Sequence, residues 1–184
     1  MSTASLRKDH DLIEKVVKSM EVTLQLLKNG KTIPESILLP VIDFSKNFTD
    51  VCHHGKEEES LFPALEQAGM PRNMGPIAVM LMEHQMTRQI ADRMEASAKE
   101  YLKTGSSANL ASDIGEYIEH VSAHLWKENN RLFMMAEMRL QGRSDQVNSG
   151  LNEVEKLKLG KLGKNRSDYE HLANQLADDV SKII

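Results

Sequence analysis

The sequence predicts an all-α protein, namely an antiparallel up-down-up-down four-helix bundle with additional C-terminal helices. Leu, Met, Ala, Glu and Lys are abundant among the 184 residues, whereas aromatic residues make up only 4%. Apolar residues also recur at the helical period through most of the chain. The breaks between these periodic segments are short, which favours antiparallel neighbours. We expect one bundle over residues 1–142, with residues 143–184 packed on it.

Turn-forming residues mark where each expected helix begins and ends. Gly30 suits the end of the first helix, and Pro34 suits the first turn of the second. Pro40 and Pro63 fall inside the second helix and predict irregularities there. The expected helices cover residues 3–27, 34–67, 76–103 and 110–140, followed by a shorter helix to about 159 and a last one from about 167.

Two distant segments share one pattern of residues. "HHGKEEESLF", from residue 53, and "HLWKENNRLF", from residue 124, both read H-x-x-K-E-x-x-x-L-F. In each copy a histidine and a glutamate lie four residues apart on one helix face, and the leucine beyond them continues that face toward the core. One such pair most simply forms an exposed ion pair. Two buried pairs are costly unless they bind a cation, so the repeat predicts a metal site.

The repeat extends to the other two long helices, where His10 and His84 each follow an acidic residue. The chain therefore reads as two helix hairpins, each with one histidine on its first helix and His-x-x-x-Glu on its second. A four-helix bundle would bring together enough ligands for two metal ions with bridging glutamates, and a set rich in nitrogen suits Fe, Zn, Cu or Ni. The expected metal ligands are His10, His53, Glu57, His84, His124 and Glu128.

These segments, together with "DHDLIE" and "GPIAVMLMEHQMTR", resemble the hemerythrin-like, or HHE cation-binding, family over residues 5–140. The resemblance implies a four-helix bundle that holds a non-heme di-iron centre, bridged by two carboxylates and an oxo or hydroxo group. It makes the four histidines above terminal ligands of two non-heme iron ions, and Glu57 and Glu128 the bridges. Members of the family bind O2, or respond to oxygen, nitric oxide, peroxide or iron.

One histidine of the oxygen-carrying members has no counterpart here, because Met80 stands one turn before His84. His120, one turn before His124, is a candidate for it, either as a ligand or as a residue behind the ligands. His171 is a second candidate if the C-terminal helix folds back over the bundle; otherwise it is a surface histidine.

His54 is not expected among the ligands. It points about 100° away from its neighbour His53 on an α-helix, and we expect it to form a surface pair with Glu58.

Three further positions each have more than one possible interpretation. Glu14 and Arg88 lie four residues after His10 and His84, and they either form a buried pair near the metals or are separate exposed charges. Glu14 could also bind a metal itself. Tyr117 either borders the site or is an ordinary core residue. Cys52 is expected to be a small buried hydrophobe.

The leading functional hypothesis is a di-iron protein that binds or reacts with O2, NO or peroxide. The alternative is a metal-handling or sensing bundle, for iron or zinc, that signals through its C-terminal helices. A metal-free interaction bundle is a third possibility. The sequence leaves open whether the protein is an enzyme, and its protein partner is unknown.

The remaining expectations concern partners and location. A net charge of −4 and a pI near 6.0 argue against nucleic acid. The apolar runs are too short to span a membrane, and the N-terminus lacks a secretory signal. With a single cysteine, these features predict a cytoplasmic protein.

Overall fold

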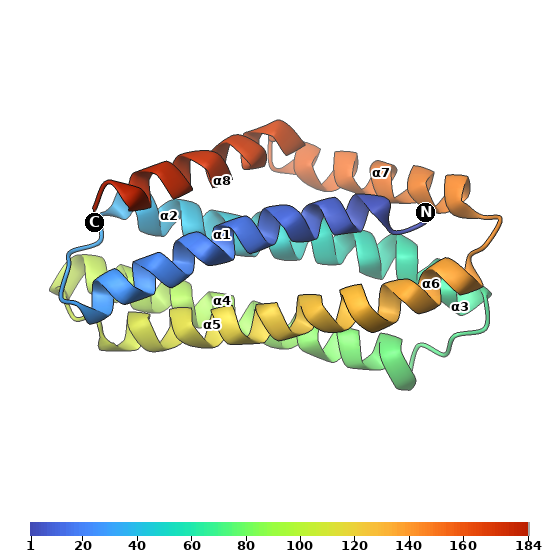
Figure 1. Cartoon of the computed structure of the whole chain (residues 1–184), viewed down its shortest axis with the longest axis horizontal. Coiled ribbons are helices and arrows are strands. Elements are labelled where there is room, and N and C mark those ends of the chain that lie inside the picture. The colour runs from blue at the N-terminus through green and yellow to red at the C-terminus, as the bar shows by residue number, and fades with distance from the viewer. Residues whose placement is uncertain (184) are drawn as a thin grey trace.

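The computed structural model describes residues 1–183, and within them the chain is helical with no strand. Four long antiparallel helical columns form a bundle, and a helical hairpin lies along its outside (Figure 1). This confirms the predicted fold class. The elements are α1 (Ala4–Lys28), α2 (Glu35–Asp43), η1 (Phe44–His54), η2 (Glu57–Leu61), α3 (Phe62–Gln67), α4 (Gly75–Thr104), α5 (Ala108–Lys127), η3 (Glu128–Leu132), α6 (Phe133–Arg139), α7 (Ser144–Lys161) and α8 (Arg166–Ser181).

Local sequence signals explain where these helices begin and end. Pro76 lies in the first turn of α4, where its missing N–H costs nothing. Gly105 ends α4 in the left-handed region at φ 76°, a conformation that favours glycine. At the start of α8, Asn165 and Asp168 form a reciprocal capping box. The predicted helix ends therefore agree with the structure to within a few residues.

The second and fourth columns contain π-helical segments, which the sequence did not predict. In the second column, α2, η1, η2 and α3 form one continuous helix, and in the fourth α5, η3 and α6 do the same. A π-helix bonds residue i to i+5 and has more residues per turn than an α-helix. Successive side chains are consequently rotated by less than the α-helical angle, which changes the residues that face the bundle interior.

The apolar core consists of two clusters. The larger includes Phe44, Phe48 and Tyr117, and the smaller includes Leu61 and Phe133. On each of the four columns, the histidine and glutamate residues of the repeat fall in sequence between residues of the larger cluster and residues of the smaller one. All of these polar residues are buried. Apolar side chains on both sides keep water away from this polar layer.

The C-terminal hairpin packs along the length of the bundle rather than across one end. α7 contacts η1 and η2, while α8 contacts α1 and α2 (Figure 1). Tyr169 of α8 is buried, with its ring 5.3 Å from that of Phe48 and 5.9 Å from that of Phe44. The proposed division of the chain at residue 142 stays a prediction.

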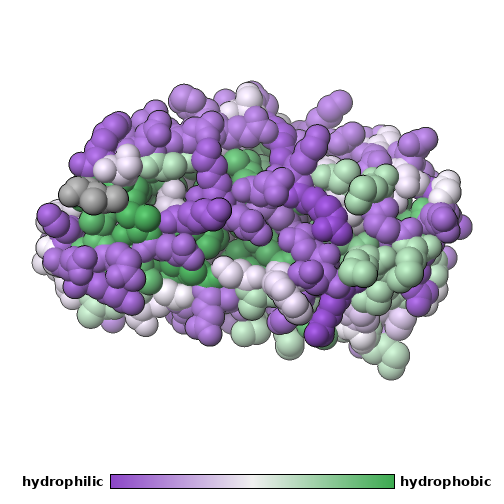
Figure 2. Space-filling view, in the orientation of Figure 1, coloured by the Kyte–Doolittle hydropathy of each residue, from purple (hydrophilic) through white to green (hydrophobic). Residues whose placement is uncertain are grey.

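The face on which α1 lies between the hairpin and the fourth column is mostly hydrophilic, with apolar patches between the polar side chains (Figure 1, Figure 2). Among the described residues, no helix has both the length and the apolar character needed to cross a membrane.

Candidate metal centre

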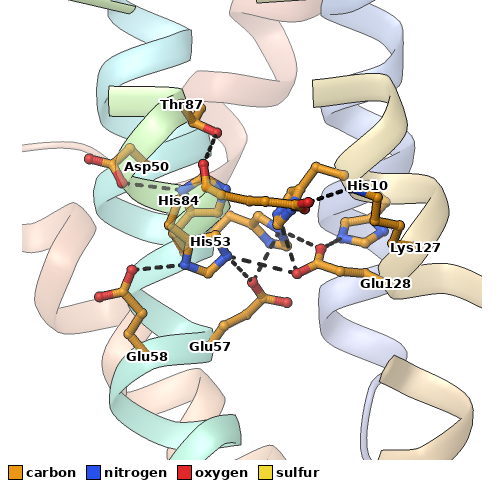
Figure 3. Close-up of polar contacts among 12 residues, drawn as sticks. His10, Asp50, His53, Glu57, Glu58, His84, Thr87, Lys127 and Glu128 are labelled. Atoms are coloured by element: carbon orange, nitrogen blue, oxygen red, sulfur yellow. Dashed lines mark hydrogen bonds and ion pairs between the residues drawn. The ribbon is translucent and has the colours of Figure 1, made fainter. Parts of the chain in front are cut away.

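The structure brings the six residues of the sequence-predicted set together inside the bundle (Figure 3). Glu128 lies near the middle of the group, with Oε2 3.2 Å from Nε2 of His10 and Oε1 3.3 Å from Nε2 of His124. Glu57 reaches the same space from η2, with Oε2 3.2 Å from Nε2 of His84. All four helical columns contribute to this cluster, as the sequence repeat predicts.

His54 is a seventh member of the cluster, and the expectation that it faces away is wrong. It is 1% exposed, and its ring stacks on that of His84 with centroids 3.9 Å apart. A nitrogen of His54 lies within 4.8 Å of nitrogens of His84 and His124. The reason is the π-helical segment η1, in which the reduced rotation per residue lets both His53 and His54 reach the interior.

Each of the five clustered histidines uses Nδ1 for a hydrogen bond outside the cluster. Because every partner is a carboxylate or amide oxygen, Nδ1–H donates and Nε2 is the nitrogen that faces the interior. Metal-bound histidines are held in the same way. The acceptors are Asn129 Oδ1 for His10 (2.9 Å), Asp9 Oδ2 for His53 (3.2 Å), Asp50 Oδ1 for His54 (3.2 Å), Glu58 Oε1 for His84 (2.8 Å) and Glu83 Oε2 for His124 (2.9 Å).

The atoms that face the interior are buried without hydrogen-bond partners. They are the Nε2 atoms of the five histidines and all four carboxylate oxygens of Glu57 and Glu128. Buried polar atoms are almost always hydrogen-bonded, so a group of this size needs an explanation. Metal–ligand bonds of about 2.1 Å place neighbouring ligand atoms about 3 Å apart. The closest separations here, 3.2 and 3.3 Å, are near that value, so the donor set fits metal ions.

The two carboxylates divide the cluster into two unequal halves. Glu128 directs Oε2 toward His10 and His53, at 3.2 and 3.9 Å. It directs Oε1 toward His84 and His124, at 3.8 and 3.3 Å. We call the space beside His10 and His53 the two-histidine position. The space beside the other three histidines, His54, His84 and His124, is the three-histidine position.

Glu57 also lies between the two positions. Its Oε2 is 3.2 Å from Nε2 of His84 on one side and 4.0 Å from Nε2 of His53 on the other. Both carboxylates are thus arranged to be shared.

Burial and ion pairing act in opposite directions within the cluster. Burial lowers the pKa of His53 to about 4, although the hydrogen bond to Asp9 acts in the opposite direction. Burial also holds the pKa of His54 well below its usual range. Burial raises the pKa of Glu57, and the nearby charge of Glu128 raises it further.

Ion pairing outweighs burial elsewhere in the cluster. Burial lowers the pKa of His84, but contacts with Glu128 and Glu57 raise it well above its usual range. Burial raises the pKa of Glu128, but the nearby histidines hold it well below its usual range. The ionised Glu128 therefore attracts positive charge into the cluster.

Two other histidines lie outside the cluster. Nε2 of His120 is 3.0 Å from both the carbonyl oxygen of Glu83 and Oγ1 of Thr87, so it contacts α4 behind His124. His171 is exposed and lines a surface pocket with Ser36 and Pro40. The C-terminal hairpin does fold back along the bundle, but it carries His171 to the surface and not to the cluster.

Of the two interpretations of Glu14 and Arg88, the buried pair near the metals is wrong, because the two side chains do not contact each other. Glu14 is exposed. Arg88 donates from Nε to Asp50 and from Nη2 to Glu58, each at 2.7 Å. It therefore supports the partners of His54 and His84.

Tyr117 and Cys52 are residues of the apolar core, as the sequence analysis allowed for Tyr117 and predicted for Cys52. Tyr117 is buried in the larger apolar cluster, and burial raises the pKa of its hydroxyl to about 12. Cys52 is buried in the same cluster, and burial likewise raises the pKa of its thiol to about 12. Such a thiol is inert.

The sequence did not predict which acidic residues accept hydrogen bonds from the clustered histidines, although two of these acids stand next to a clustered histidine in the chain. Asp9 and Glu83 directly precede His10 and His84 in the chain. In the structure each serves a histidine of another helix: Asp9 accepts from His53 and Glu83 from His124. An acidic residue next to a clustered histidine therefore indicates a hydrogen-bond acceptor for the cluster. Only the packing of the helices decides which histidine donates to it.

The fold and this cluster define a helical-bundle protein with a cation-binding centre. The sequence model of the Hemerythrin HHE cation binding domain matches residues 1–136, so the chain belongs to that family. The chain is also similar to the iron-sulfur cluster repair protein YtfE of Musicola paradisiaca (strain Ech703), with 37% identity over 89 residues. That match covers 46% of this chain and only 40% of the relative. No solved structure matches the chain.

Proposed function

We propose that the cluster holds two non-heme iron ions and that the protein binds or reacts with a small molecule such as O2, NO or peroxide. The observation that carries this proposal is the unequal division of the donor atoms. One ion would have three histidines and the other two, while Glu57 and Glu128 are shared between them. The ion at the three-histidine position would thus have more protein ligands than the ion at the two-histidine position, which leaves room for a small molecule at the latter; an oxo or hydroxo group would complete the centre.

The donor chemistry supports iron over zinc. Imidazole and carboxylate without thiolate suit non-heme iron, and five nitrogens beside four oxygens exceed the needs of two tetrahedral zinc ions. Membership of a cation-binding family is consistent with this choice. When bound, an iron pair supplies exchangeable electrons and an open coordination position for a small ligand.

The surroundings of the two-histidine position restrict what can reach it. The ring of Phe133 stacks on His10 with centroids 5.0 Å apart, and Leu6 and Leu61 are fully buried nearby in the same apolar cluster as Phe133. These side chains exclude water and favour a small, uncharged ligand.

An apolar pocket of about 240 Å³ lies between α4 and the end of the fourth column. Met80 and Leu132 line it, and each is one helical turn from a cluster residue, His84 or Glu128. We propose it as the entry route for the small molecule. The pocket is lined by Gly75, Pro76, Val79, Met80, Lys127, Arg131, Leu132 and Met135.

The alternative is a metal-handling or sensing protein, for iron or zinc, that signals through the C-terminal helices. The contact of Arg166 in α8 with Asp9, the partner of His53, favours this reading. The relative's named activity, iron–sulfur cluster repair, would be one form of metal handling, and it extends to this chain only as a hypothesis. The cytoplasmic location is likewise proposed, and the single buried cysteine supports it.

Metal analysis of protein purified without oxygen tests the proposal, followed by optical spectra before and after addition of O2, NO or hydrogen peroxide. We expect about two iron ions per chain and new charge-transfer absorption with at least one of the three ligands. About one zinc ion, or no metal, with unchanged spectra would remove the support for a ligand-binding di-iron protein. Iron without any spectral response would favour the metal-handling alternative.

A further inference from the structure

Asp9 connects the cluster to the C-terminal hairpin. Its carboxylate is completely buried. Oδ2 accepts a hydrogen bond from Nδ1 of His53 at 3.2 Å and lies 2.6 Å from Nζ of Lys56. Oδ1 accepts from Nη1 of Arg166, at the start of α8, at 2.6 Å. The carboxylate of Asp9 thus accepts hydrogen bonds both from His53, at the two-histidine position, and from Arg166, in the hairpin outside the bundle.

A second residue of the hairpin completes this network. Glu155 of α7 places Oε2 2.7 Å from Nζ of Lys56 and 3.2 Å from Nη1 of Arg166. Lys56 is itself completely buried and also donates to Oγ of Ser5 at 3.0 Å. Two carboxylates and two cations therefore balance one another, which is the condition for keeping such charges inside a protein.

The carboxylates that accept hydrogen bonds from the three other histidines, at the three-histidine position, pair with cations of the bundle itself. Arg88 of α4 supports Asp50 and Glu58, and Lys127 of α5 supports Glu83. These cations belong to the bundle, and the side chains of Arg88 and Lys127 are 40% and 38% exposed. Arg166 is 26% exposed and its acceptor is fully buried, so solvent screens this interaction less.

We propose that Arg166 is a positioning residue, through which the C-terminal hairpin sets the metal affinity of the two-histidine position. The inference rests on the proposed metal centre. Arg166 and Lys56 fix both oxygens of Asp9, and Asp9 fixes the ring of His53. Loss of Arg166 leaves Oδ1 of Asp9 buried without its cation, and the carboxylate can then turn away from His53. Outer partners of this kind change metal affinity by about 10- to 100-fold when removed.

Replacement of Arg166 in the full-length protein tests the proposal. Metal-free Arg166→Gln, Arg166→Lys and wild-type protein are titrated with Co²⁺, whose visible absorption reports coordination number and distinguishes the two positions. Lys164→Gln is the matched control, because Lys164 lies in the same hairpin but pairs with Asp43 rather than Asp9. We expect Arg166→Gln to weaken the Co²⁺ site of the two-histidine position about 10-fold and leave the three-histidine position unchanged. Arg166→Lys should recover most of the loss, and Lys164→Gln should behave as wild type.

Two results would overturn the inference. Arg166→Gln could bind both Co²⁺ ions as wild type does, or it could weaken both sites equally, as general loosening of the bundle predicts. If Arg166→Gln does not fold, Glu155→Gln takes its place, since it removes the carboxylate that orients Arg166. It should weaken the same single site by less than Arg166→Gln does, because Arg166 stays in place, and unchanged affinity would count against the proposal. Failure of the wild-type protein to bind two metal ions would instead refute the proposed function.

Discussion

The two halves of the cluster differ although the helices that build them repeat one motif. At the two-histidine position, His10 and His53 are backed by Asn129 and Asp9. At the three-histidine position, every ring is backed by a carboxylate, and the rings of His54 and His84 stack. A repeated sequence pattern therefore does not imply two equivalent sets of donor atoms.

The asymmetry depends largely on one residue. When the two repeat strings are aligned on His53 and His124, His54 falls opposite Leu125. Leu125 is buried in apolar core, whereas His54 is buried in the cluster. A histidine added to one copy of the motif thus makes the halves unequal, and the predictions below test this difference from the largest expected effect to the smallest.

Glu128→Gln should remove metal binding at both positions, because Glu128 directs one oxygen to each. We expect metal content to fall from about two ions per chain to near zero. Metal-free Glu128→Gln should unfold at a lower temperature than metal-free wild type, because it breaks the buried pairs of Glu128 with His10 and His124. Metal analysis and thermal unfolding measure the two effects.

The matched control for that variant is Glu59→Gln, which changes a surface carboxylate paired with Lys158. It should keep both metal ions. A Glu128→Gln protein that kept one ion at wild-type affinity would show that this carboxylate is not shared.

His54→Leu should abolish the asymmetry by making the first motif like the second. We expect the Co²⁺ affinity of the three-histidine position to fall about 100-fold, because that position loses a nitrogen ligand and keeps two histidines. His120→Leu is the control and should bind both ions as wild type does, since His120 contacts α4 behind the cluster. Equal Co²⁺ affinities in the two variants would contradict the assignment of His54.

Arg88→Gln should weaken the three-histidine position alone, because Arg88 holds the partners of His54 and His84. We expect a loss of affinity of about 10-fold at one Co²⁺ site. This site should differ from the one that Arg166→Gln weakens, so a double variant should weaken both. Arg93→Gln, at a surface arginine of the same helix that pairs with Glu116, should change neither. The comparison fails if both arginine variants affect the same site.

Glu137→Gln should have the smallest effect of these variants. It is expected to lower the stability of the fold by loosening the start of α1. Glu137 accepts hydrogen bonds from the backbone N–H groups of Ser2 and Thr3, which fixes the start of the helix that carries His10. Burial raises the pKa of Glu137, but the hydrogen bonds from Thr3 and Ser2 lower it more. We expect a loss of about 1–2 kcal/mol in the free energy of unfolding at neutral pH.

The pH dependence of this effect has a definite sign. Because the folded-state pKa of Glu137 lies below its usual value of 4.5, the carboxylate stabilises the fold above pH 4.5. That stabilisation is lost as the pH falls through the folded-state pKa. Denaturant unfolding of wild type and Glu137→Gln at several pH values should therefore show a difference that shrinks below pH 4.5. A difference that grew on acidification would mean that the carboxylate does not anchor the N-terminus.

The sequence by itself determined the helical columns, their order and the six residues of the repeated motif. Helical periodicity, turn residues and the spacing of His53 from Glu57 are local properties, and local geometry converts them directly into faces of helices. The same reasoning failed at His54, because it assumed α-helical rotation where η1 is π-helical.

Only the tertiary structure decided how the cluster is supported. Asp9 is next to His10 in the chain but accepts from His53, and Arg166 reaches Asp9 from the far end of the sequence. Such contacts depend on how separate helices are rotated and shifted against one another. Hydrogen bonds form over about 3 Å, so a shift of one residue along a helix is enough to exchange one partner for another.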